Sequence, residues 1–439
     1  MTTNKFKIVT LGCKVNQHES AYIRDSLIAS GYNEAAKNEQ ADLIVINTCI
    51  VTQTASSQSR QAIRKAIKEN PSSTTAAVGC YAQVFPEELT PIDGINIIAG
   101  NTEKGRLINI LQDNSAPCRP CAIPEKFIKP MPFEFLPIKG FLDRTRAFIK
   151  IQDGCESFCS YCIVPYARGP LRSLDPSLVI DSLKSLADEG YKEVVLSGIH
   201  LGKYGIDQKE PVSLNGLLNL IGRENLGPRI RLSSLEPNEI DEELIDMISS
   251  EEWLCSHLHI PLQSGNGGIL RRMNRHYSPE EFAKLVELIH RKIPMAAIGA
   301  DVIAGFPGED DQAHQDTCSI IRNLPVSYLH VFPFSPRKGT PAAGFSDQTG
   351  RLQVKKRAAE LRDLGRKKRG IFNQSCIGKE FSILTEGWES GENNRIKGLS
   401  DNYLSVVFPS SELTTNKIVK VRIETIQEDR IIGRPKWEE

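Results

Sequence analysis

Apolar residues in the first hundred positions follow two alternating patterns, which together predict an open α/β sheet. Short apolar runs typical of strands occur at residues 6–13 (FKIVTLGC), 41–49 (ADLIVINTC), 74–80 (TTAAVGC) and 95–100 (INIIAG). Between them, residues 18–31 and 56–70 have the periodicity of amphipathic helices, closed by Gly31 and by Pro71. Because continuous apolar runs are typical of strands buried on both faces, we expect a parallel sheet.

A more regular alternation in the middle of the chain predicts an incomplete parallel barrel. Six segments indicate strands, at residues 146–152, 193–198, 229–235, 258–264, 297–305 and 328–334. Helical periodicity separates most of them, for example at residues 176–189, 279–291 and 311–323. Six successive βα units predict a partial (β/α)6 barrel rather than the full eight-stranded form.

From residue 374 onward the pattern changes to short strands, which predict a small all-β barrel. Residues 116–140 are rich in proline and are predicted to be a linker. The expected organisation is an N-terminal domain over residues 4–115, the linker over 116–140, a central domain over 141–370 and the C-terminal barrel over 373–437.

Composition restricts the class of protein only loosely. The 439 residues carry a formal net charge of zero, so a nucleic-acid partner is not indicated by overall charge. A local basic stretch, residues 355–370, has eight basic and two acidic side chains, and its default interpretation is a solvated helix face. No apolar run is long enough to cross a bilayer, so no membrane association is expected.

Cysteine usage favours a reducing compartment. The chain has eleven cysteines, an odd number, and its N-terminus lacks the apolar region of a signal peptide. We therefore expect a cytoplasmic protein whose thiols bind metal or take part in catalysis. One pair, Cys118 and Cys121, forms a CxxC, but no strand–helix context accompanies it, so we do not interpret it as a redox or zinc motif.

Three cysteines of the N-terminal region, Cys13, Cys49 and Cys80, each stand just after a predicted strand. Ligands of open α/β sheets bind beyond the carboxyl ends of the strands, where these thiols would converge. A buried free cysteine also behaves as a small hydrophobic residue. Because the same placement recurs three times, the sequence favours a shared metal site.

A second group of three thiols lies on one short loop, DGCESFCSYC, with Cys155, Cys159 and Cys162 at gaps of three and two residues. Three thiolates can hold three corners of a four-iron cluster and leave the fourth iron open, and an open position indicates catalysis. Structural zinc would need a fourth ligand nearby, and the next histidine is His200. The loop follows the first predicted barrel strand, and chemistry in such barrels is built at the carboxyl ends of the strands.

The CxxxCxxC loop and its context resemble the radical S-adenosylmethionine (radical SAM) methylthiotransferases. The segments LGCKVNQHES, INTC, VGCYAQ, YCIVPYARGPLRS, SSLEP, PLQSGN and DVIAGFPGE match the motifs of that family in the family's order, over nearly the whole chain. Within the family, LGCKVNQ is most similar to the enzymes acting on N6-threonylcarbamoyladenosine at position 37 of tRNA. The isopentenyladenosine enzymes favour GCQMN, and the enzymes that modify a ribosomal protein aspartate favour GCxKN.

The resemblance implies two [4Fe-4S] clusters. The loop cysteines would hold the cluster that binds and cleaves S-adenosylmethionine, and the three N-terminal cysteines would hold an auxiliary cluster that carries the transferred sulfur. A radical would abstract hydrogen from carbon 2 of adenine, and a methylthio group would replace it. By family pattern and barrel position, the expected S-adenosylmethionine contacts are Tyr161, Ser197, Glu236, Gln263, Arg275, Gly305, Pro307 and Glu309. Structural ion pairs are the alternative role for the charged members, and Arg168 could lie near the cluster or at the anticodon backbone.

The same resemblance extends to the partners. The C-terminal barrel resembles the TRAM domain, an RNA-binding module, and with a tRNA substrate residues 355–370 are expected to contact phosphates. The expected partners are the anticodon stem-loop of tRNA and a reductant such as flavodoxin or ferredoxin, with the chain as a monomer. Two other classes remain open: a cluster-bearing electron carrier and a zinc-dependent RNA-binding protein. Isopentenyladenosine in tRNA and a ribosomal protein aspartate remain alternative substrates.

Overall fold

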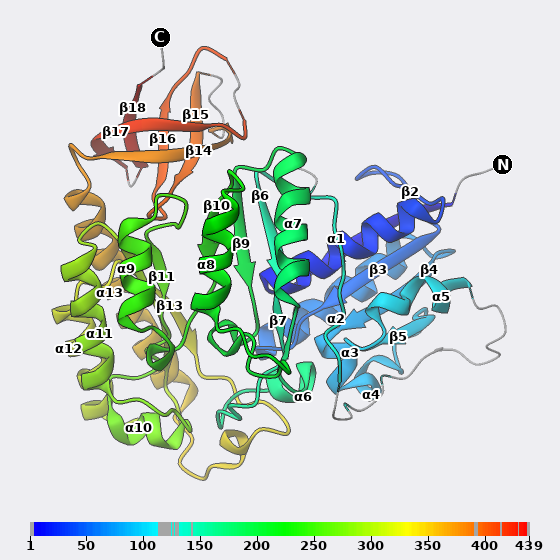
Figure 1. Ribbon diagram of the computed structural model, residues 1–439. Helices are drawn as coiled ribbons and strands as arrows, with labels where there is room; N and C mark the ends of the chain where they lie inside the picture. The colour runs from blue at the N-terminus through cyan, green and yellow to red at the C-terminus, as the bar shows by residue number, and fades with distance from the viewer. Residues whose placement is uncertain are drawn as a thin grey trace.

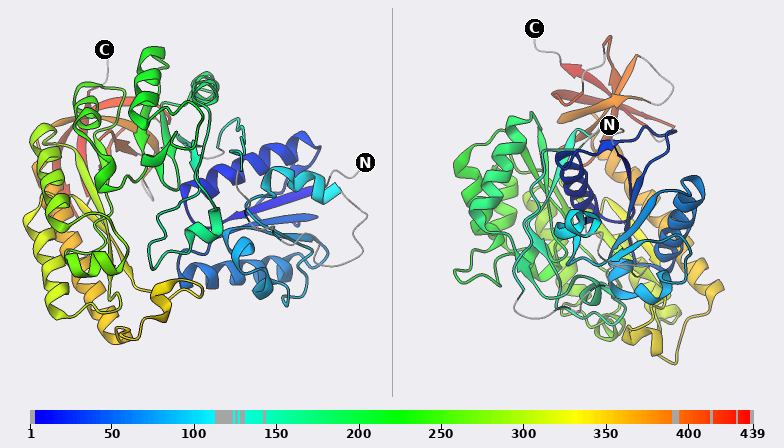
Figure 2. Two further views of the ribbon diagram at one scale, coloured as in Figure 1. Left: turned by 60° about the horizontal axis from the view of Figure 1, so that its bottom comes forward. Right: turned by 90° about the vertical axis from the view of Figure 1, so that its right-hand side faces the viewer.

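The computed structural model describes residues 4–112, 124, 127, 131–141, 144–389, 394–412, 415–428 and 430–436. It has an N-terminal sheet, a central partial barrel and a small C-terminal β-barrel (Figure 1). The views in Figure 2 place the N-terminal sheet beside the central domain. Cys118 and Cys121, with the CxxC interpretation, lie outside the described residues. Among the described residues, no helix is both long and apolar enough to span a membrane.

The N-terminal sheet has five parallel strands in the order β2-β1-β3-β4-β5. The strands are β1 Lys5–Thr10, β2 Asn33–Glu34, β3 Leu43–Thr48, β4 Thr74–Gly79 and β5 Ile97–Ala99. The helices are α1 Lys14–Ala29, α2 Gln53–Glu69, α3 Cys80–Val84, α4 Pro86–Leu89 and α5 Leu107–Gln112. Every residue of β3 is buried, as its continuous apolar run predicts. The predicted open parallel sheet is confirmed.

Two helices of this region begin earlier than the periodicity predicts. The helix expected from residue 18 begins at Lys14, with Cys13 as its N-cap in an extended backbone conformation. The helix expected from residue 56 begins at Gln53, because the side chain of Thr52 accepts a hydrogen bond from the Ala55 N–H at 3.0 Å. The first turn of α1 has one apolar residue, Val15, among polar ones, and the first turn of α2 has only Ala55, so the apolar repeat gives the start of each helix too late.

The central domain confirms the predicted partial barrel of six parallel strands in two three-stranded sheets. The strands are β6 Arg146–Lys150, β9 Glu193–Ser197, β10 Arg229–Leu232, β11 His257–His259, β12 Ala297–Ala304 and β13 Tyr328–Pro333. A parallel bridge between Ile230 and Leu254 continues the wall from one sheet to the other. The principal helices are α7 Pro176–Asp188, α8 Leu214–Glu224, α9 Glu242–Ser250, α10 Gly267–Arg272, α11 Pro279–Lys292, α12 Asp311–Asn323 and α13 Arg351–Ser375.

The cysteine loop follows the first barrel strand, as predicted. It lies between two short antiparallel strands, β7 Gln152–Asp153 and β8 Arg172–Ser173, and is followed by α6 Val164–Arg168. Helix α1 of the N-terminal region packs against β6, and α13 packs against β12 and β13. The N-terminal sheet therefore adjoins the barrel at its first strand, close to the cysteine loop.

The C-terminal barrel is closed in the order β14-β15-β16-β18-β17, as the short-strand pattern predicts. Its strands are β14 Glu380–Trp388, β15 Arg395–Ser400, β16 Ser405–Pro409, β17 Ile418–Gln427 and β18 Arg430–Lys436. Arg229 and Arg231 both bind Glu193 and donate hydrogen bonds to backbone carbonyls of this barrel, including those of Ser382 and Ser400. Since these residues lie at the amino ends of β9 and β10, the C-terminal barrel sits opposite the cysteine loop.

A candidate active site with two cysteine sets

The first set of thiols, here called the dispersed set, comprises Cys13, Cys49 and Cys80. Cys13 follows β1, Cys49 follows β3 and Cys80 follows β4, and these three strands are neighbours in one parallel sheet. The carboxyl ends of adjacent parallel strands lie at one edge of the sheet, so the topology brings the three thiols together. The predicted convergence is therefore present, although the cysteines are separated by up to 67 residues in sequence (80 − 13).

Two glycines allow this convergence. Gly12 has φ +95°, and a Cβ atom built on it would lie 2.8 Å from the Sγ atom of Cys49. Gly79, also at φ +95°, precedes Cys80, and a Cβ atom there would lie 2.5 Å from Oδ1 of Asn47. A side chain at either position would be strained and would displace its neighbour. The backbone beside the dispersed set is therefore shaped for close approach.

The second set of thiols, here called the loop set, comprises Cys155, Cys159 and Cys162, and it lies beside the first. Ile163 and Ala167, which follow Cys162 on the loop and in α6, belong to the same buried apolar cluster as Cys80. The side chain of Asn101 donates hydrogen bonds to Sγ of Cys80 at 3.5 Å and to the carbonyl of Ala167 at 2.6 Å. The packing of α3 against α6 therefore joins the two sets across the domain boundary.

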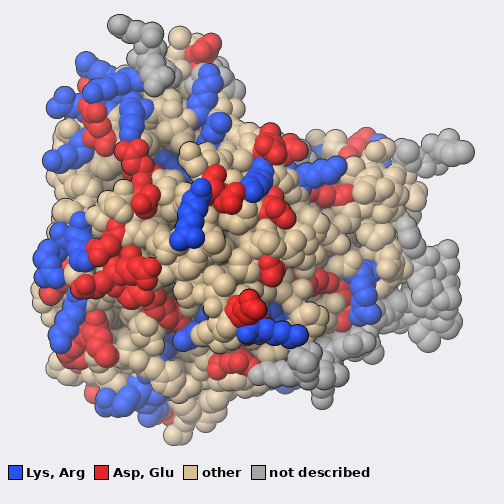
Figure 3. Space-filling view, viewed as in Figure 1, with Lys and Arg blue, Asp and Glu red and all other residues tan. Residues whose placement is uncertain are grey.

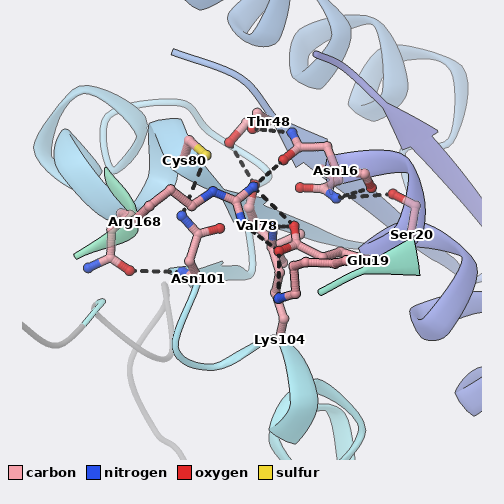
Figure 4. Close-up of polar contacts among 12 residues, drawn as sticks. Asn16, Glu19, Ser20, Thr48, Val78, Cys80, Asn101, Lys104 and Arg168 are labelled. Atoms are coloured by element: carbon pink, nitrogen blue, oxygen red, sulfur yellow. Dashed lines mark hydrogen bonds and ion pairs between the residues drawn. The ribbon is translucent and has the colours of Figure 1, made fainter. Parts of the chain in front are cut away.

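A buried ion cluster, here called the Glu19 network, underlies this junction (Figure 4). Arg168 binds the Glu19 carboxylate through both terminal nitrogens and donates a 2.6 Å hydrogen bond to Oδ1 of Asn16. Lys104 also binds Glu19, and Lys150 lies 3.3 Å from it. The network is completed by Asp153, which accepts from Lys150, Arg168 and Arg172 at 3.2 to 3.5 Å.

The Glu19 network carries an excess of positive charge. Its members are four cations and two anions, Lys104, Lys150, Arg168, Arg172, Glu19 and Asp153, which gives a net charge of +2. Burial alone would raise the pKa of Glu19, but Arg168, Lys104 and Lys150 hold it well below its ordinary value. Arg168 also interacts electrostatically with Cys13, Cys49 and Cys80. This charge suits a site of several thiolates.

Arg168 can now be assigned to one of the two locations considered for it. Its side chain is 1% exposed and is enclosed by the Glu19 network, so it cannot reach the backbone of a bound RNA. It lies near the dispersed set instead. The network itself was not foreseen. The only local signal for it is that Asn16, Glu19 and Ser20 are polar residues on the buried side of α1.

The loop set has its own charged neighbours. Nδ1 of His200 lies 3.5 Å from Sγ of Cys155, and its Nε2 lies 2.6 Å from Glu239. Burial would lower the pKa of His200, but its hydrogen bonds to Cys155 and Glu239 raise that pKa to about 10. Arg275 donates to Sγ of Cys159 at 3.5 Å and to Glu236 at 2.9 Å. Glu239 and the contact of His200 with Cys155 were not predicted from the sequence.

Two of the predicted cofactor contacts line a cavity of about 100 Å³ beside the loop set. Glu236 and Arg275 line it together with Cys159, His200 and Tyr277. Tyr161 packs its ring edge-on against Phe306 with the centroids 6.4 Å apart. The structure thus brings Glu236, which follows β10, and Arg275, which follows α10, to the loop set.

Three predicted contacts present buried polar atoms without a hydrogen-bond partner in the described chain. They are Oγ of Ser197, Oε1 of Gln263 and Nη2 of Arg275. Ser197 ends β9, and Gln263 follows β11 with φ +60°, a conformation that is unusual for a non-glycine residue. Buried polar groups are nearly always paired, so unpaired ones at the carboxyl ends of barrel strands indicate a polar ligand. These three polar atoms therefore fit a small molecule with hydroxyl, amino and carboxylate groups.

The three predicted contacts after β12, Gly305, Pro307 and Glu309, do not line the cavity beside the loop set. Oε1 of Glu309 accepts from the Gly305 N–H at 3.1 Å and from Arg357 of α13 at 3.0 Å. Gly305 has φ +77°, and a Cβ there would lie 2.5 Å from Val354 of α13. Pro307 is buried. Glu309 is thus an ion-pair partner of α13, the alternative considered for the charged residues, and the close approach at Gly305 is to a helix.

Two family models match the chain. The description "Uncharacterized protein family UPF0004" matches residues 5–100, which include the dispersed set, and "Radical SAM superfamily" matches residues 149–321, which include the loop set. Among solved structures, the radical S-adenosylmethionine methyltransferase TsrM from Kitasatospora setae, described with cobalamin and a [4Fe-4S] cluster bound, has a TM-score of 0.55 at 15% identity and covers 78% of this chain and 77% of its own. That likeness shows the fold of the part of the chain that it covers.

Curated relatives match over nearly the full length. Threonylcarbamoyladenosine tRNA methylthiotransferase MtaB of Bacillus subtilis is 39% identical, covering 94% of this chain and 92% of the relative. The protein of the same name from Aquifex aeolicus is 36% identical, with 92% and 96% covered. A tRNA-2-methylthio-N(6)-dimethylallyladenosine synthase of Moorella thermoacetica is 31% identical, with 96% of each chain covered. The chain therefore belongs to the radical SAM methylthiotransferase family.

Proposed function

We propose that this protein is a tRNA-modifying enzyme that adds a methylthio group to carbon 2 of N6-threonylcarbamoyladenosine at position 37. The observation that carries the proposal is the pairing of two three-cysteine sets across the α3–α6 contact, beside unpaired polar atoms on the barrel strands. The names of the B. subtilis and A. aeolicus relatives support the choice of threonylcarbamoyladenosine.

Each cysteine set would hold one [4Fe-4S] cluster, because three thiolates leave one iron open to a further ligand. When bound, the loop-set cluster and S-adenosylmethionine would supply radical chemistry, and the dispersed-set cluster would supply the sulfur. We assign Ser197, Gln263 and Arg275 to S-adenosylmethionine, since they offer unpaired polar atoms. Tyr161 and Glu236 complete the set. Gly305, Pro307 and Glu309 would support the pocket without touching the bound molecule, since Gly305 and Glu309 pack against α13.

The side chains around the loop set have distinct tasks in this proposal. Arg275 is held by Glu236 at 2.9 Å through Nη1, and its buried Nη2, which has no partner in the described chain, is left to bind a carboxylate. His200, kept protonated by Cys155 and Glu239, would balance thiolate charge. The Glu19 network would do the same at the dispersed set through its net charge of +2.

Binding of tRNA would fall to the C-terminal barrel and helix α13. Lys and Arg side chains gather over the C-terminal barrel on the face shown in Figure 3. Arg422, Arg434 and Lys436 line an open groove of about 470 Å³ on that barrel. On α13, Lys355, Lys356 and five further basic residues keep exposed or half-exposed positions. These cations suit phosphate contacts, as expected of a TRAM-like module.

We further propose the predicted domain assignment, residues 4–115 for the auxiliary-cluster domain, 141–370 for the radical SAM domain and 373–437 for the TRAM domain. The expected setting is cytoplasmic, with the chain acting as a monomer and receiving electrons from a flavodoxin or ferredoxin. The parallel sheet and the partial barrel each have a buried apolar cluster of their own, and the cluster of the C-terminal barrel includes Ala297 as its one residue from the described central strands, which supports this division.

Mass spectrometry of digested tRNA from a strain lacking this gene, beside its parent, tests the proposal. We expect the methylthio form of threonylcarbamoyladenosine to vanish and the unthiolated form to accumulate. Loss of the methylthio isopentenyl form would instead assign the dimethylallyladenosine substrate. Unchanged tRNA would contradict the proposal and favour a ribosomal protein substrate or a non-enzymatic role.

A further inference from the structure

A chain of polar side chains crosses the last three strands of the central barrel, away from the residues assigned above. Nε2 of His259 on β11 lies 2.7 Å from Oδ1 of Asp301 on β12, and Nδ1 of His330 on β13 lies 3.3 Å from the same oxygen. Nδ1 of His259 is 3.0 Å from the hydroxyl of Tyr328, which also contacts His257 at 2.8 Å. Five polar side chains are thus linked from one strand to the next.

These side chains face the interior of the barrel. Along β12 the residues Ile298, Ala300 and Val302 belong to the core under the outer helices, so Asp301 points to the opposite face. Ile303 is on the same face as Asp301 and packs with Phe306, against which Tyr161 of the cysteine loop lies. Asp301 therefore stands on the inner face roughly 7 Å, two residues of strand, from the apolar cluster that touches the loop set.

The inner face is open at this point. His330 is exposed over 54% of its side chain, and Asp301 over 22%. Phe332, two residues further along the same face of β13, is 40% exposed. A histidine and a phenylalanine this exposed on the inside of a barrel leave space for a ligand, whereas a packed barrel would bury both.

The surroundings of this face favour an anion. Lys14, the residue after Cys13, interacts electrostatically with Arg231 and His257 and so adds a cation next to the dispersed set. Arg369 lies over the ring of Tyr328, 5.0 Å from its centroid, and has one buried nitrogen without a partner in the described chain. The charged side chains that interact here are five cations and two anions, Lys14, Arg146, Arg229, Arg231, Arg369, Glu193 and Asp301. Of the cations, Arg146, Arg229 and Arg231 are paired with Glu193.

We propose that His330, oriented by Asp301 and His259, binds the carboxylate of the N6 substituent of the target adenosine and thereby selects the threonylcarbamoyl form; this inference rests on the proposed function. Asp301 lies 3.3 Å from Nδ1 of His330, which leaves Nε2 for the ligand, and with a carboxylate at each nitrogen the ring would be the imidazolium, which donates from both. An apolar isopentenyl group would leave Nε2 of His330 and the buried Arg369 nitrogen without a partner, which opposes its binding.

The position of the site agrees with the geometry of the base. In adenine, C2 and C6 both bond N1, and their exocyclic bonds diverge, so a substituent on N6 can extend in a different direction from the C2–H bond. Asp301 lies roughly 13 Å along β12 from Gly305, at the strand end where the loop set is found. With C2 beside the cysteines, the substituent would reach into the barrel toward His330.

The test measures binding of three anticodon stem-loops at one salt concentration, carrying threonylcarbamoyladenosine, its methyl ester, or unmodified adenosine. We expect the unaltered protein to bind the free acid about tenfold more tightly than the ester. In His330→Leu this preference should disappear, while His290→Leu, a change at an exposed histidine of α11, should keep it. Iron content and melting temperature identify a His330→Leu protein that folds badly, and His330→Gln then replaces it.

Three outcomes would overturn the inference. His330 variants could keep the preference for the acid, or the unaltered protein could bind acid and ester equally. A His330 variant that weakens all three stem-loops by the same factor would assign this side chain to a phosphate of the RNA. A separate assay of methylthio transfer to the acid-bearing stem-loop reports on the proposed function, because its absence in the unaltered protein contradicts that function without involving His330.

Discussion

The two cysteine sets contain the same number of thiols but are built in opposite ways. The loop set spans eight residues of one loop, from Cys155 to Cys162, so its spacing is fixed by the local chain. The dispersed set comes from three strands, and only the order β1-β3-β4 makes its members neighbours. The loop set is steadied by single partners such as His200 and Arg275, whereas the dispersed set borders a six-residue ion cluster.

This difference shows which set depends on the packing of the whole molecule for the positions of its thiols. A short loop can adjust its three thiols together, but thiols on separate strands depend on how the strands and their neighbouring domain are held. The Glu19 network links α1, η1 (Lys104–Arg106), β6, β7 and α6, and so connects the N-terminal region to the central barrel. We infer that the network fixes the distance between the two sets as well as balancing charge.

Removal of one thiol from either set should have the largest effect. Cys159→Ala and Cys80→Ala are each expected to lose about half of the bound iron and all detectable methylthio transfer, since one cluster would lack a ligand. Only Cys159→Ala should also abolish reductive cleavage of S-adenosylmethionine. Iron analysis and detection of 5′-deoxyadenosine check this. Equal loss of cleavage in both variants would contradict the division of roles.

Breaking the Glu19 network should cost the fold more than any surface change. Arg168→Met removes one of three cationic partners from each of two buried carboxylates, so we expect the free energy of unfolding of the metal-free protein to fall by about 1.5–3 kcal/mol. Arg366→Met, which breaks an exposed pair with Asp363, should cost less than about 1 kcal/mol. Urea unfolding of both variants measures the difference, and similar losses would show that the network adds no stability.

The close approach at Gly12 can be tested against a glycine of similar backbone conformation. Gly12→Ala and Gly31→Ala both place a side chain at positive φ, near +95° and +88°, which costs about 1–2 kcal/mol. Only at Gly12 would the new Cβ meet Cys49, since nothing lies within 4 Å of the position at Gly31. We expect Gly12→Ala alone to reduce bound iron. Equal iron content in the two variants would rule out this role of Gly12.

The pH dependence of stability gives a smaller effect. The Glu19 pKa is lower in the folded protein than the ordinary value of 4.5, so its stabilisation is present above about pH 4.5 and is lost as the pH falls toward the folded pKa. Between about pH 4.5 and 3, the unaltered protein should lose stability more steeply than Glu19→Gln, by up to about 1.4 kcal/mol per pH unit. Parallel curves from urea unfolding would show that Glu19 does not titrate in this range.

The smallest change is expected at Ser197. Its buried Oγ has no partner in the described chain, so Ser197→Ala should alter the free energy of unfolding by less than about 0.5 kcal/mol. Loss of a hydrogen bond to S-adenosylmethionine should weaken binding of that molecule about tenfold. Calorimetry and equilibrium binding separate the two effects, and unchanged binding would remove Ser197 from the proposed cofactor site.

The sequence by itself determined the three kinds of secondary-structure pattern, the parallel sheet, the partial barrel and the small β-barrel. It also determined the loop set, because the spacing of Cys155, Cys159 and Cys162 is local. Placement of Cys13, Cys49 and Cys80 after strands was enough to predict their convergence, since parallel strands share one edge.

Only the tertiary structure decided which side chains pair with the buried charged residues. Glu19 meets Arg168 across 149 residues of sequence, and Asp301 meets His259 and His330 because three strands are adjacent in that order. It also decided that Glu309 faces Arg357 of α13. Periodicity shows which side of an element is buried but not which element covers it, so the partner of a buried charge becomes known only when the elements are packed together.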